Sequence, residues 1–384
     1  MPRIWFSSVV ILLSLIFYTY YKISQFLPEH RVLAFLFTLL LFLIMIGWEL
    51  IYRYNVFLSD QFWFRALAWI GSTLLGVWVT FILFSLAVDL CRLILWLVMI
   101  LSHTSTLNQV QNLFLSKWLT ITILIISLLL SGLGLKTALS GPQVVEVFVP
   151  IKNKATILKA VKIVQISDLH VGPLIRHDYV AKVVKKVNEL KPDFIVLTGD
   201  VADGDADALA KQLESLANLK ASFGKFYVTG NHEYYWGAGQ WIKTMSGLGF
   251  TPLVNENRVI DFSGVKILFA GVTDVSGGQF LPEHKPEVER AVYSQEASDF
   301  KILLSHSPRV LCDAQKVGFN LQLSGHTHAG QFFPFSLLVP LAHKYHTGLN
   351  CQNEIWLYIN SGTGSWGPVN RFGVHSEITV VRFR

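Results

Sequence analysis

Five short segments of the sequence combine carboxylate, imidazole and amide side chains at spacings suited to metal binding. They are Ser167-Asp168-Leu169-His170, Gly199-Asp200-Val201-Ala202-Asp203, Gly230-Asn231-His232-Glu233, Ser305-His306 and Gly325-His326-Thr327-His328. Such oxygen and nitrogen donors suit manganese, iron or zinc rather than a soft thiolate site. The three cysteines of the chain are too few and too scattered for a cysteine-based zinc site or a disulfide framework. The chemistry indicated is that of a metal centre built from Asp, Asn and His.

Each of these segments, taken alone, also has an ordinary structural explanation. Asp168 and His170 are compatible with a turn carboxylate beside a surface histidine, and Gly199-Asp200 is common turn chemistry. A single histidine such as His306 is more often structural than a ligand. The spaced pair His326 and His328 is the most specific element. The hypothesis of one shared metal site therefore depends on the presence of all five segments, in this order, in one chain.

Each segment directly follows a stretch that reads as a β-strand. The strands that precede the five segments are predicted at residues 161–166, 194–198, 225–229, 301–304 and 320–323. Further strands are predicted at 144–149, 266–270, 355–359 and 378–383, and helices at 177–190, 206–219 and 239–248. This alternation predicts a layered α/β architecture. The carboxyl ends of strands in such sheets converge on one crevice, so five strand ends can build one site.

The first part of the chain has a different character. Apolar runs at residues 4–21, 32–52, 66–88 and 118–139 each reach the roughly 20 residues that cross a hydrocarbon core. Hydrophobic residues make up 52% of the chain and charged residues only 15%, whereas soluble domains average about 25% charged residues. An entirely soluble or disordered chain is therefore excluded. We expect a four-helix transmembrane domain at 1–142 and an α/β domain at 143–384.

Two features of the apolar part leave alternatives open. A secretory signal peptide is the rival explanation for the first run, but no small-residue cleavage site follows it, so we expect an uncleaved anchor. The third run continues through 91–101, and a helix over 66–101 would be roughly 54 Å long at 1.5 Å per residue. It would project beyond the bilayer, kink or lie along the interface. Asp89 and Arg92 lie three residues apart, which predicts a mutual ion pair near a helix end, with a transport or sensing role as the alternative.

The net charge of +6 does not indicate nucleic-acid binding. Residues 1–142 hold 8 Lys and Arg against 4 Asp and Glu, so the surplus flanks the apolar runs. Four spans put both ends of this domain on one side of the membrane. That side would carry Arg3, Arg53, Arg65, Lys152 and Lys154, and the opposite side Lys22, Arg31 and Lys117. The positive-inside rule then predicts a multi-pass protein of the inner membrane with its catalytic half in the cytoplasm.

The ordered set Asp-x-His, Gly-Asp-x-x-Asp, Gly-Asn-His-Glu, His and Gly-His-x-His resembles the calcineurin-like metallophosphoesterase family. The resemblance covers roughly residues 160–384, and four spans ahead of the domain resemble a membrane-bound bacterial branch. Glu233 stands where many members have Asp, and it is not a metal ligand. The resemblance implies a four-layer α/β/β/α sandwich that binds two divalent cations. Manganese is the first expectation for these cations, with iron, zinc or magnesium as alternatives.

The resemblance also implies a role for each motif residue. It assigns a first metal to Asp168, His170 and His328, a second to Asn231, His306 and His326, and the bridging position to Asp200. Two cations about 3.5–4 Å apart would clamp a phosphate and activate a water as hydroxide. His232 would protonate the leaving oxygen or stabilise the transition-state charge. Asp203 would orient His232, or alternatively act as a turn or N-cap residue before the helix at 206–219.

Residues 330–341 follow His328 and contain no charged residue and two prolines. They predict either a buried connection without regular structure or an apolar flap that meets the bilayer or holds acyl chains. Trp366, Asn370 and Arg371 are candidates to face the site. A surface salt bridge is the favoured interpretation of Arg371, with pairing to a substrate phosphate as the alternative. We expect a phosphodiester or pyrophosphate as substrate, for instance lipid-linked UDP-2,3-diacylglucosamine, although Gly204 stands where the best-known lipid A hydrolases have Arg-Tyr. The alternatives are a non-catalytic membrane scaffold, or a transport or sensor protein with a phosphoesterase-fold appendage.

Overall fold

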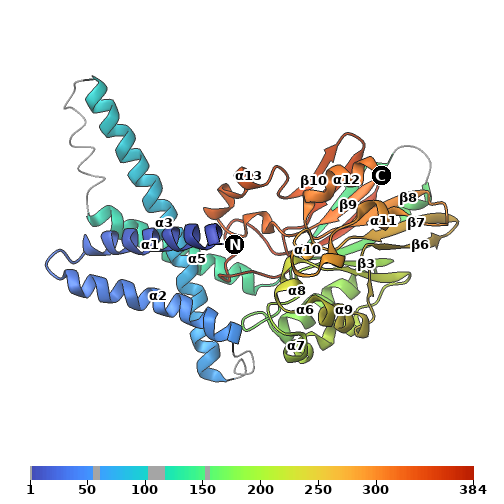
Figure 1. The fold of residues 1–384 in the computed structure, drawn as a ribbon, viewed down its shortest axis with the longest axis horizontal. Coiled ribbons are helices and arrows are strands. Elements are labelled where there is room, and N and C mark those ends of the chain that lie inside the picture. Colours follow the sequence, from blue (N-terminus) through green and yellow to red (C-terminus); the bar gives the residue numbers. More distant parts are fainter. Residues whose placement is uncertain (1, 55–60, 103–116, 152–155) are drawn as a thin grey trace. The chain divides into compact units, whose positions relative to one another are not determined.

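The computed structural model describes residues 2–54, 61–102, 117–151 and 156–384, and of these it leaves out the side chains of 2–10 and 48–54. Contacts divide the chain into two compact units, Met1–Leu133 and Gly134–Arg384 (Figure 1). The first unit has a small apolar cluster that includes Phe81, Ile82 and Ile123. The second unit has three larger hydrophobic clusters.

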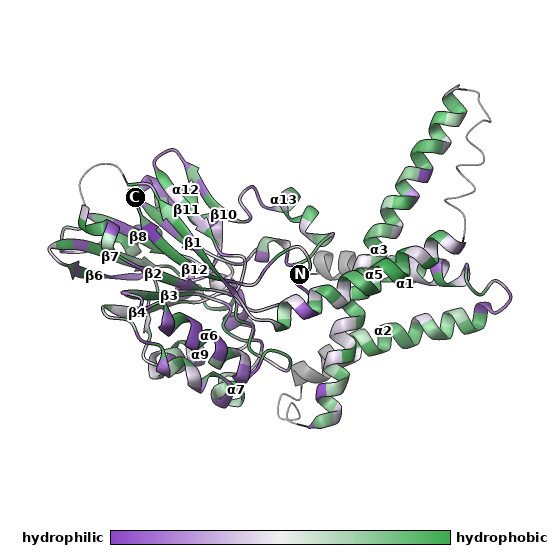
Figure 2. Ribbon diagram, turned by 180° about the vertical axis from the view of Figure 1, so that it is seen from behind, coloured by the Kyte–Doolittle hydropathy of each residue, from purple (hydrophilic) through white to green (hydrophobic). Residues whose placement is uncertain are grey.

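The first unit is helical, and its helices are apolar along most of their length (Figure 2). The helices are α1 (Pro2–Ser24), α2 (Arg31–Tyr54), α3 (Phe62–Ser102) and α5 (Lys117–Leu139), whose end belongs to the second unit. In the described residues, α3 and α5 are long and apolar enough to cross a membrane. The described apolar stretches of α1 and α2, Ile11–Ser24 and Arg31–Gly47, are shorter. Two of the four predicted transmembrane spans are therefore long and apolar enough to cross a membrane in the described residues. The prediction of four spans is not confirmed.

Helix α3 is a single helix of 41 residues and includes the segment 91–101. The predicted pair is present, with Arg92 Nη1 lying 3.2 Å from Asp89 Oδ1. Helix α1 adds two donors that the sequence did not predict: Lys22 Nζ lies 2.9 Å from Asp89 Oδ1, and the Tyr18 hydroxyl donates to Asp89 Oδ2 at 2.7 Å. An ionisable group among apolar helices is costly unless it is paired, and these donors supply the pairing.

The same contacts bear on the predicted orientation. The Lys22 side chain is only 5% exposed and is paired with Asp89, so it is not a free cation flanking a span. The predicted orientation compared the basic residues on the two sides of the membrane. Of those expected on the cytoplasmic side, Lys152 and Lys154 lie outside the described residues, as do the side chains of Arg3 and Arg53. The sidedness of the catalytic half stays a prediction.

The second unit contains two six-stranded mixed sheets. The first has the order β1-β12-β2-β3-β4-β5, with β1 (Gln143–Val149), β12 (Glu377–Phe383), β2 (Ile163–Ile166), β3 (Phe194–Thr198), β4 (Gly224–Val228) and β5 (Thr251–Pro252). The second has the order β10-β11-β9-β8-β7-β6, with β10 (Gly348–Gln352), β11 (Ile355–Ile359), β9 (Leu321–Ser324), β8 (Phe300–Leu304), β7 (Val265–Gly271) and β6 (Glu256–Phe262). Strands β2 to β5 are mutually parallel, and so are β7, β8, β9 and β11. Each sheet therefore presents several carboxyl ends at one edge.

The strands bury both of their faces, which makes a sandwich of four layers. Alternate residues of β3 point to different cores: Ile195 and Leu197 join the cluster beneath the helices, whereas Phe194 and Val196 join the cluster between the two sheets. The outer face of the first sheet is covered by α6 (His177–Glu189), α7 (Ala206–Leu213) and α9 (Ala238–Gly247). That of the second is covered by α11 (Val288–Val292) and α12 (Leu311–Lys316). This agrees with the expected α/β/β/α order.

The remaining elements are short. They are the helices α8 (Asn231–Tyr235), α10 (Gly277–Phe280) and α13 (Val339–Ala342), and the 3-10 turns η2 (Thr156–Ala160), η3 (Glu214–Asn218), η4 (Pro282–His284), η5 (Pro308–Val310), η6 (His328–Gly330) and η7 (Phe335–Leu337). The helix predicted at 206–219 is divided into α7 and η3. The segment 330–341 was expected to lack regular structure if it were a buried connection, yet it contains η7 and α13.

Candidate metal centre

The five predicted segments follow strands of both sheets. Those after β2, β3 and β4 come from the first sheet, and those after β8 and β9 from the second. Backbone hydrogen bonds join neighbouring strand ends: Asp168 N donates to Gly199 O at 3.0 Å, and Gly325 N donates to His306 O at 2.9 Å. The metal centre therefore lies where the carboxyl edges of the two sheets meet.

Five of the predicted site residues adopt a left-handed backbone conformation that is uncommon for residues other than glycine. Their φ angles lie between 49° and 75°, at Asp168, His170, Asp200, His326 and His328. The turns that follow the strands are therefore sharp, and they direct these side chains back over the sheet edge. Local strain of this kind clusters at functional sites.

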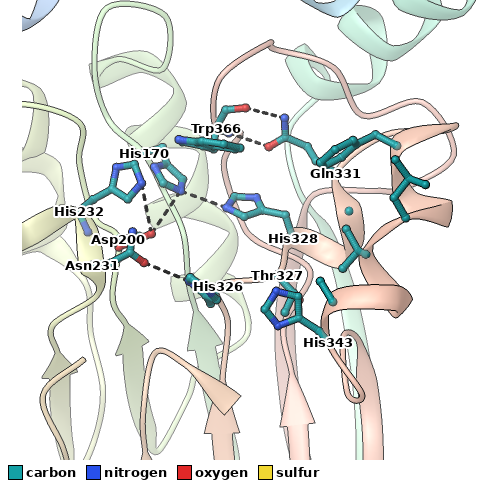
Figure 3. A pocket seen from close by; sticks show the side chains of 15 residues that line it. His170, Asp200, Asn231, His232, His326, Thr327, His328, Gln331, His343 and Trp366 are labelled. Atoms are coloured by element: carbon teal, nitrogen blue, oxygen red, sulfur yellow. Dashed lines mark hydrogen bonds and ion pairs between the residues drawn. The ribbon is translucent and has the colours of Figure 1, made fainter. Parts of the chain in front are cut away.

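The residues expected around the first metal lie together. His328 Nε2 lies 3.2 Å from Asp168 Oδ1 and 3.1 Å from His170 Nε2. All three side chains are buried. Figure 3 shows His170 and His328 pointing toward each other.

The residues expected around the second metal form a neighbouring group. His306 Nε2 lies 3.2 Å from Asn231 Oδ1 and 3.1 Å from His326 Nδ1, and His326 Nδ1 lies 3.0 Å from Asn231 Oδ1. Asp200 Oδ2 lies 3.2 Å from His306 Nε2 and 3.8 Å from His170 Nε2. Asp200 thus contacts both groups, as a bridging carboxylate would, and Figure 3 shows its contact with His170.

The hydrogen-bond chemistry of these groups fits divalent cations. His306 Nδ1 faces the carbonyl oxygen of Thr198 at 2.8 Å and must donate to it, so a neutral His306 ring would turn a lone pair on Nε2 toward the acceptors Asp200 and Asn231, where a cation could bind. His170 Nδ1 likewise donates to the Asp203 carboxylate at 2.9 Å. Two donors bound to one cation at about 2.0–2.2 Å lie about 3–3.6 Å apart. Most of the separations above fall in this interval.

The buried carboxylates of the site also favour bound positive charge. Burial raises the pKa of Asp200, but the nearby His306 and His232 outweigh burial and hold it well below the usual range. Burial lowers the pKa of His306, but Asp200 and Asp168 raise it well above its ordinary value. Burial and the neighbouring His306 lower the pKa of His326 to about 4, so that ring is neutral and able to ligate.

His232 and Asp203 form a pair beside the first group. His232 Nδ1 lies 2.5 Å from Asp203 Oδ1, the same oxygen that accepts from His170. Burial lowers the pKa of His232, but the carboxylates of Asp200 and Asp203 outweigh it and raise the pKa to about 10. The N-cap alternative for Asp203 is wrong, because Asp205 caps α7 by accepting from the backbone N–H groups of Asp207 and Ala208.

Glu233 has a supporting role that the sequence did not indicate. Its carboxylate is fully buried and accepts from the backbone N–H groups of Gly230, Asp200 and Val201. It therefore fixes the backbone of Asp200 and joins the β3 and β4 strand ends. Burial and the charge of Asp200 raise the pKa of Glu233 to about 7.

Asp274 is a further buried carboxylate that the sequence analysis missed. It lies shortly after β7, the neighbour of β8, and its Oδ1 accepts from the backbone N–H and the hydroxyl of Ser276. Its Oδ2 is buried and has no partner among the described residues. The position of Asp274 could have identified it, since it follows the end of a strand as the five predicted segments do.

A pocket of about 410 Å³ opens over the metal centre. Its polar floor includes His170, Asp200, Asn231, His232 and His328 (Figure 3). The pocket also has an apolar lining of Phe335, Leu338, Val339 and Ala342, and the ring of Trp366 lies edge-on to that of His232, with centroids 6.4 Å apart. The candidate flap therefore contributes to the pocket, although Phe332 is buried and does not line it.

The final loop differs from the prediction at Arg371. Trp366 lines the pocket, but Arg371 is fully buried behind His328, with 0% exposure, so the surface salt bridge is wrong. Its guanidinium donates to backbone carbonyls, including that of Ser361 at 2.7 Å. Asn370 is also buried and does not line the pocket. No local pattern distinguishes such an arginine from an exposed one.

The chain resembles known proteins over this domain and beyond it. The family model described as calcineurin-like phosphoesterase matches residues 161–330. A protein named uncharacterized metallophosphoesterase from Campylobacter jejuni is 32% identical over 94% of this chain and 92% of its own length. A zebrafish (Danio rerio) protein named transmembrane protein with metallophosphoesterase domain is 33% identical over 68% of this chain and 61% of its own. An uncharacterized metallophosphoesterase of Helicobacter pylori is 37% identical over 58% and 60%. The chain thus spans less than two thirds of the last two relatives.

Proposed function

Because the chain belongs to the calcineurin-like metallophosphoesterase family, we propose that it is a membrane-anchored hydrolase that cleaves a phosphodiester or pyrophosphate bond with two divalent cations. One observation carries this proposal: donor atoms from five strand ends converge in two groups that share Asp200. We assign the first cation to Asp168, His170 and His328, the second to Asn231, His306 and His326, and the bridge to Asp200.

The protein residues have separate tasks around this centre. Bound divalent cations supply charge neutralisation for the phosphate and a water of lowered pKa. His232 lines the pocket, and the carboxylates of Asp200 and Asp203 favour its protonated form by raising its pKa, so its Nε2–H would donate to the leaving oxygen. Asp203 holds the Nδ1 side of that ring and of His170, and is a positioning residue. The complete ligand set argues against a non-catalytic scaffold.

We propose a lipid-linked phosphate compound as the substrate class. The pocket is lined by residues of the metal centre and also by Phe335, Leu338 and Val339. Beyond the pocket, Leu337 and Leu341 of the same segment are 64% and 85% exposed. Apolar side chains left in water beside a pocket suit acyl chains or a bilayer surface. The membrane anchoring is supported by the apolar helices α3 and α5 and by the name of the zebrafish relative.

The hydrolase is tested on detergent-solubilised protein that has been stripped of metal and reloaded with Mn²⁺. The substrates are a chromogenic phosphodiester and a panel of nucleotide, sugar and lipid diphosphates that includes UDP-2,3-diacylglucosamine. We expect Asp200→Ala to abolish hydrolysis and Asp178→Asn, whose side chain is fully exposed, to leave it unchanged. Full activity of Asp200→Ala would falsify the proposal.

The lipid-linked substrate is tested separately with Phe335→Ser/Leu338→Ser. We expect this variant to lose at least about tenfold in kcat/KM on a lipid diphosphate, because one lost apolar contact is worth about 1–3 kcal/mol, and to keep its activity on the chromogenic diester. Tyr293→Ser is the matched control, since Tyr293 is 75% exposed and does not line the pocket. Equal losses on both substrates would count against acyl-chain binding at this apolar lining.

A further inference from the structure

The C-terminal turns of α5 lie directly against the final loop of the second unit. Arg371 N donates to the Gly134 carbonyl at 3.0 Å. A Cβ atom on Gly134 would lie 1.7 Å from Asn370 Oδ1 and 2.9 Å from Phe372 N, so only glycine allows this approach. Ala138, one turn further along, is also buried. By contrast, a Cβ atom on the exposed Gly132 of the same helix would meet nothing within 4 Å.

The side chain of the same Arg371 reaches the first group of metal ligands. Its Nη1 donates to the His328 carbonyl at 3.5 Å, and its Nη2 donates to the Gly362 and Gly364 carbonyls. Nη2 also lies 3.1 Å from His328 Nδ1, but a ring that ligates through Nε2 keeps its proton on Nδ1, so this is a packing contact and not a hydrogen bond. Arg371 Nη1 also donates to the Ser361 carbonyl at 2.7 Å. The planar guanidinium presents five donors in a fixed fork, which a lysine ammonium cannot reproduce.

The loop that Arg371 holds also supports Asp168. Gly364 N donates to the Asp168 carbonyl at 2.9 Å, and Thr363 N donates to the Ser167 carbonyl at 2.7 Å. A Cβ atom on Gly364 would lie 1.9 Å from Leu169 O, so loop and ligand segment are in close contact. Arg371 thus contacts His328 directly and reaches Asp168 through Gly364.

The second group of ligands is held by different contacts. His306 is oriented by the Thr198 carbonyl, and Asp200 and Asn231 belong to strand ends fixed by Glu233. In the described part of the chain, the hydrogen bonds of Arg371 involve His328 and residues of its own loop and α5, and none involves His306 or Asn231. Arg371 therefore supports the first group directly and the second only through contacts between the groups, such as His326 N, which donates to the Asp168 carboxylate at 3.1 Å.

We propose that Arg371 is the positioning residue of the first metal site, and that its contact with Gly134 makes this site dependent on the position of residues 134–139, the end of α5 that belongs to the second unit. The inference rests on the proposed function, because it takes Asp168, His170 and His328 as ligands of one cation. Displacement of the last turns of α5 would weaken the first site and leave the second intact.

The test compares Gly134→Ala with Gly132→Ala in full-length protein. Both changes raise helix propensity equally, by about 1 kcal/mol, and only the first creates a clash. Metal-free protein in detergent is titrated with Mn²⁺, and bound manganese is counted after equilibrium dialysis. We expect wild type and Gly132→Ala to bind two Mn²⁺ with unchanged affinities. Gly134→Ala is expected to bind one Mn²⁺ normally and the other at least about tenfold more weakly, a loss of about 1.4 kcal/mol.

Arg371→Lys is the second variant, and it carries the test if Gly134→Ala does not fold. We expect it to show the same selective loss of one Mn²⁺, while thermal unfolding of the metal-free protein shows that the domain is folded. Two unchanged binding steps in both variants, or equal weakening of both steps, would overturn the inference. If wild type itself binds no Mn²⁺, the proposed function fails instead, so the two failures are distinguishable.

Discussion

The pair formed by Asp203 and His232 yields a quantitative prediction about pH. If His232 acts as the proton donor, hydrolysis requires its protonated form and must fall as the pH rises through its pKa. The raised pKa of about 10 depends on the carboxylates of Asp200 and Asp203. Bound cations lower this pKa, because positive charge disfavours a second positive charge nearby. They do so in wild type and variant alike, so the difference between the two is the quantity to measure.

Asp203→Asn keeps an oxygen that accepts from His232 Nδ1 and removes the negative charge. A hydrogen bond that involves a charged group contributes about 1.5–3 kcal/mol, against about 0.5–1.5 kcal/mol for a neutral one. The difference of about 1–2 kcal/mol corresponds to about one pKa unit at 1.4 kcal/mol per unit. We therefore expect the alkaline limb of the kcat profile to move about one unit toward lower pH. The sign follows because the variant stabilises the protonated ring less.

The assay is a pH–rate profile on the chromogenic diester with saturating Mn²⁺, together with a count of bound manganese, because Asp203 also contacts His170. Asp205→Asn is the matched control, since Asp205 lies two residues away and caps α7. Asparagine caps helices as well as aspartate does, so its profile should match wild type. An alkaline limb that stays in place in Asp203→Asn, with two Mn²⁺ bound, would refute the role of His232 as the acid.

Three further predictions concern stability. Glu233→Ala removes the acceptor of three buried backbone N–H groups, and should lower the free energy of unfolding by at least about 3 kcal/mol, measured by denaturant titration of the metal-loaded protein; unchanged stability would contradict the support assigned to it. Chelation of metal with EDTA should abolish hydrolysis and lower the melting temperature, because cations at 100 times their Kd stabilise by about 2.7 kcal/mol; a metal-free protein that melts at the same temperature would speak against metal binding. Asp89→Asn should lower the melting temperature in detergent, because the buried Lys22 would lose its charged partner, and should leave chromogenic diester hydrolysis unchanged; a loss of hydrolysis in the folded variant would show that Asp89 matters for the catalytic domain.

The candidate ligands were predictable from the sequence because chemistry and position coincide in them. Asp168, Asn231 and His306 have side chains that can ligate a metal, and each follows a strand that is recognisable in the sequence as a short apolar run. The sequence did not show how the five strands are divided between two sheets, because the residues of a strand do not indicate which strand it pairs with. Strands β6 and β10 were missed for a related reason. Both are edge strands, and their half-exposed residues, such as Glu256 and Asn350, lack the apolar pattern of a buried strand.

The supporting residues were less predictable than the ligands. Glu233 was recognised as a motif position, but its three backbone acceptor contacts depend on how β3 and β4 lie side by side. Arg371 lies in a glycine-rich loop whose local sequence suggests exposure. Its burial comes from the approach of His328 and of the loop at 361–364, which only the assembled sandwich brings together. The burial of such residues depends on contacts between segments that are distant in the chain, and the local sequence does not indicate these contacts.

The distance along the chain between ligands has a consequence for biosynthesis. His170 and His328 lie 158 positions apart yet touch in the first group. A ribosome must therefore have released almost the whole catalytic domain before both rings can meet, and by then the apolar helices have long since emerged. Asp168, His170 and Asp200 lie within 33 residues of one another on the ends of the paired strands β2 and β3, but the complete first group also needs His328. A fully formed first group therefore requires the chain to be synthesised at least as far as His328, close to its C-terminal end.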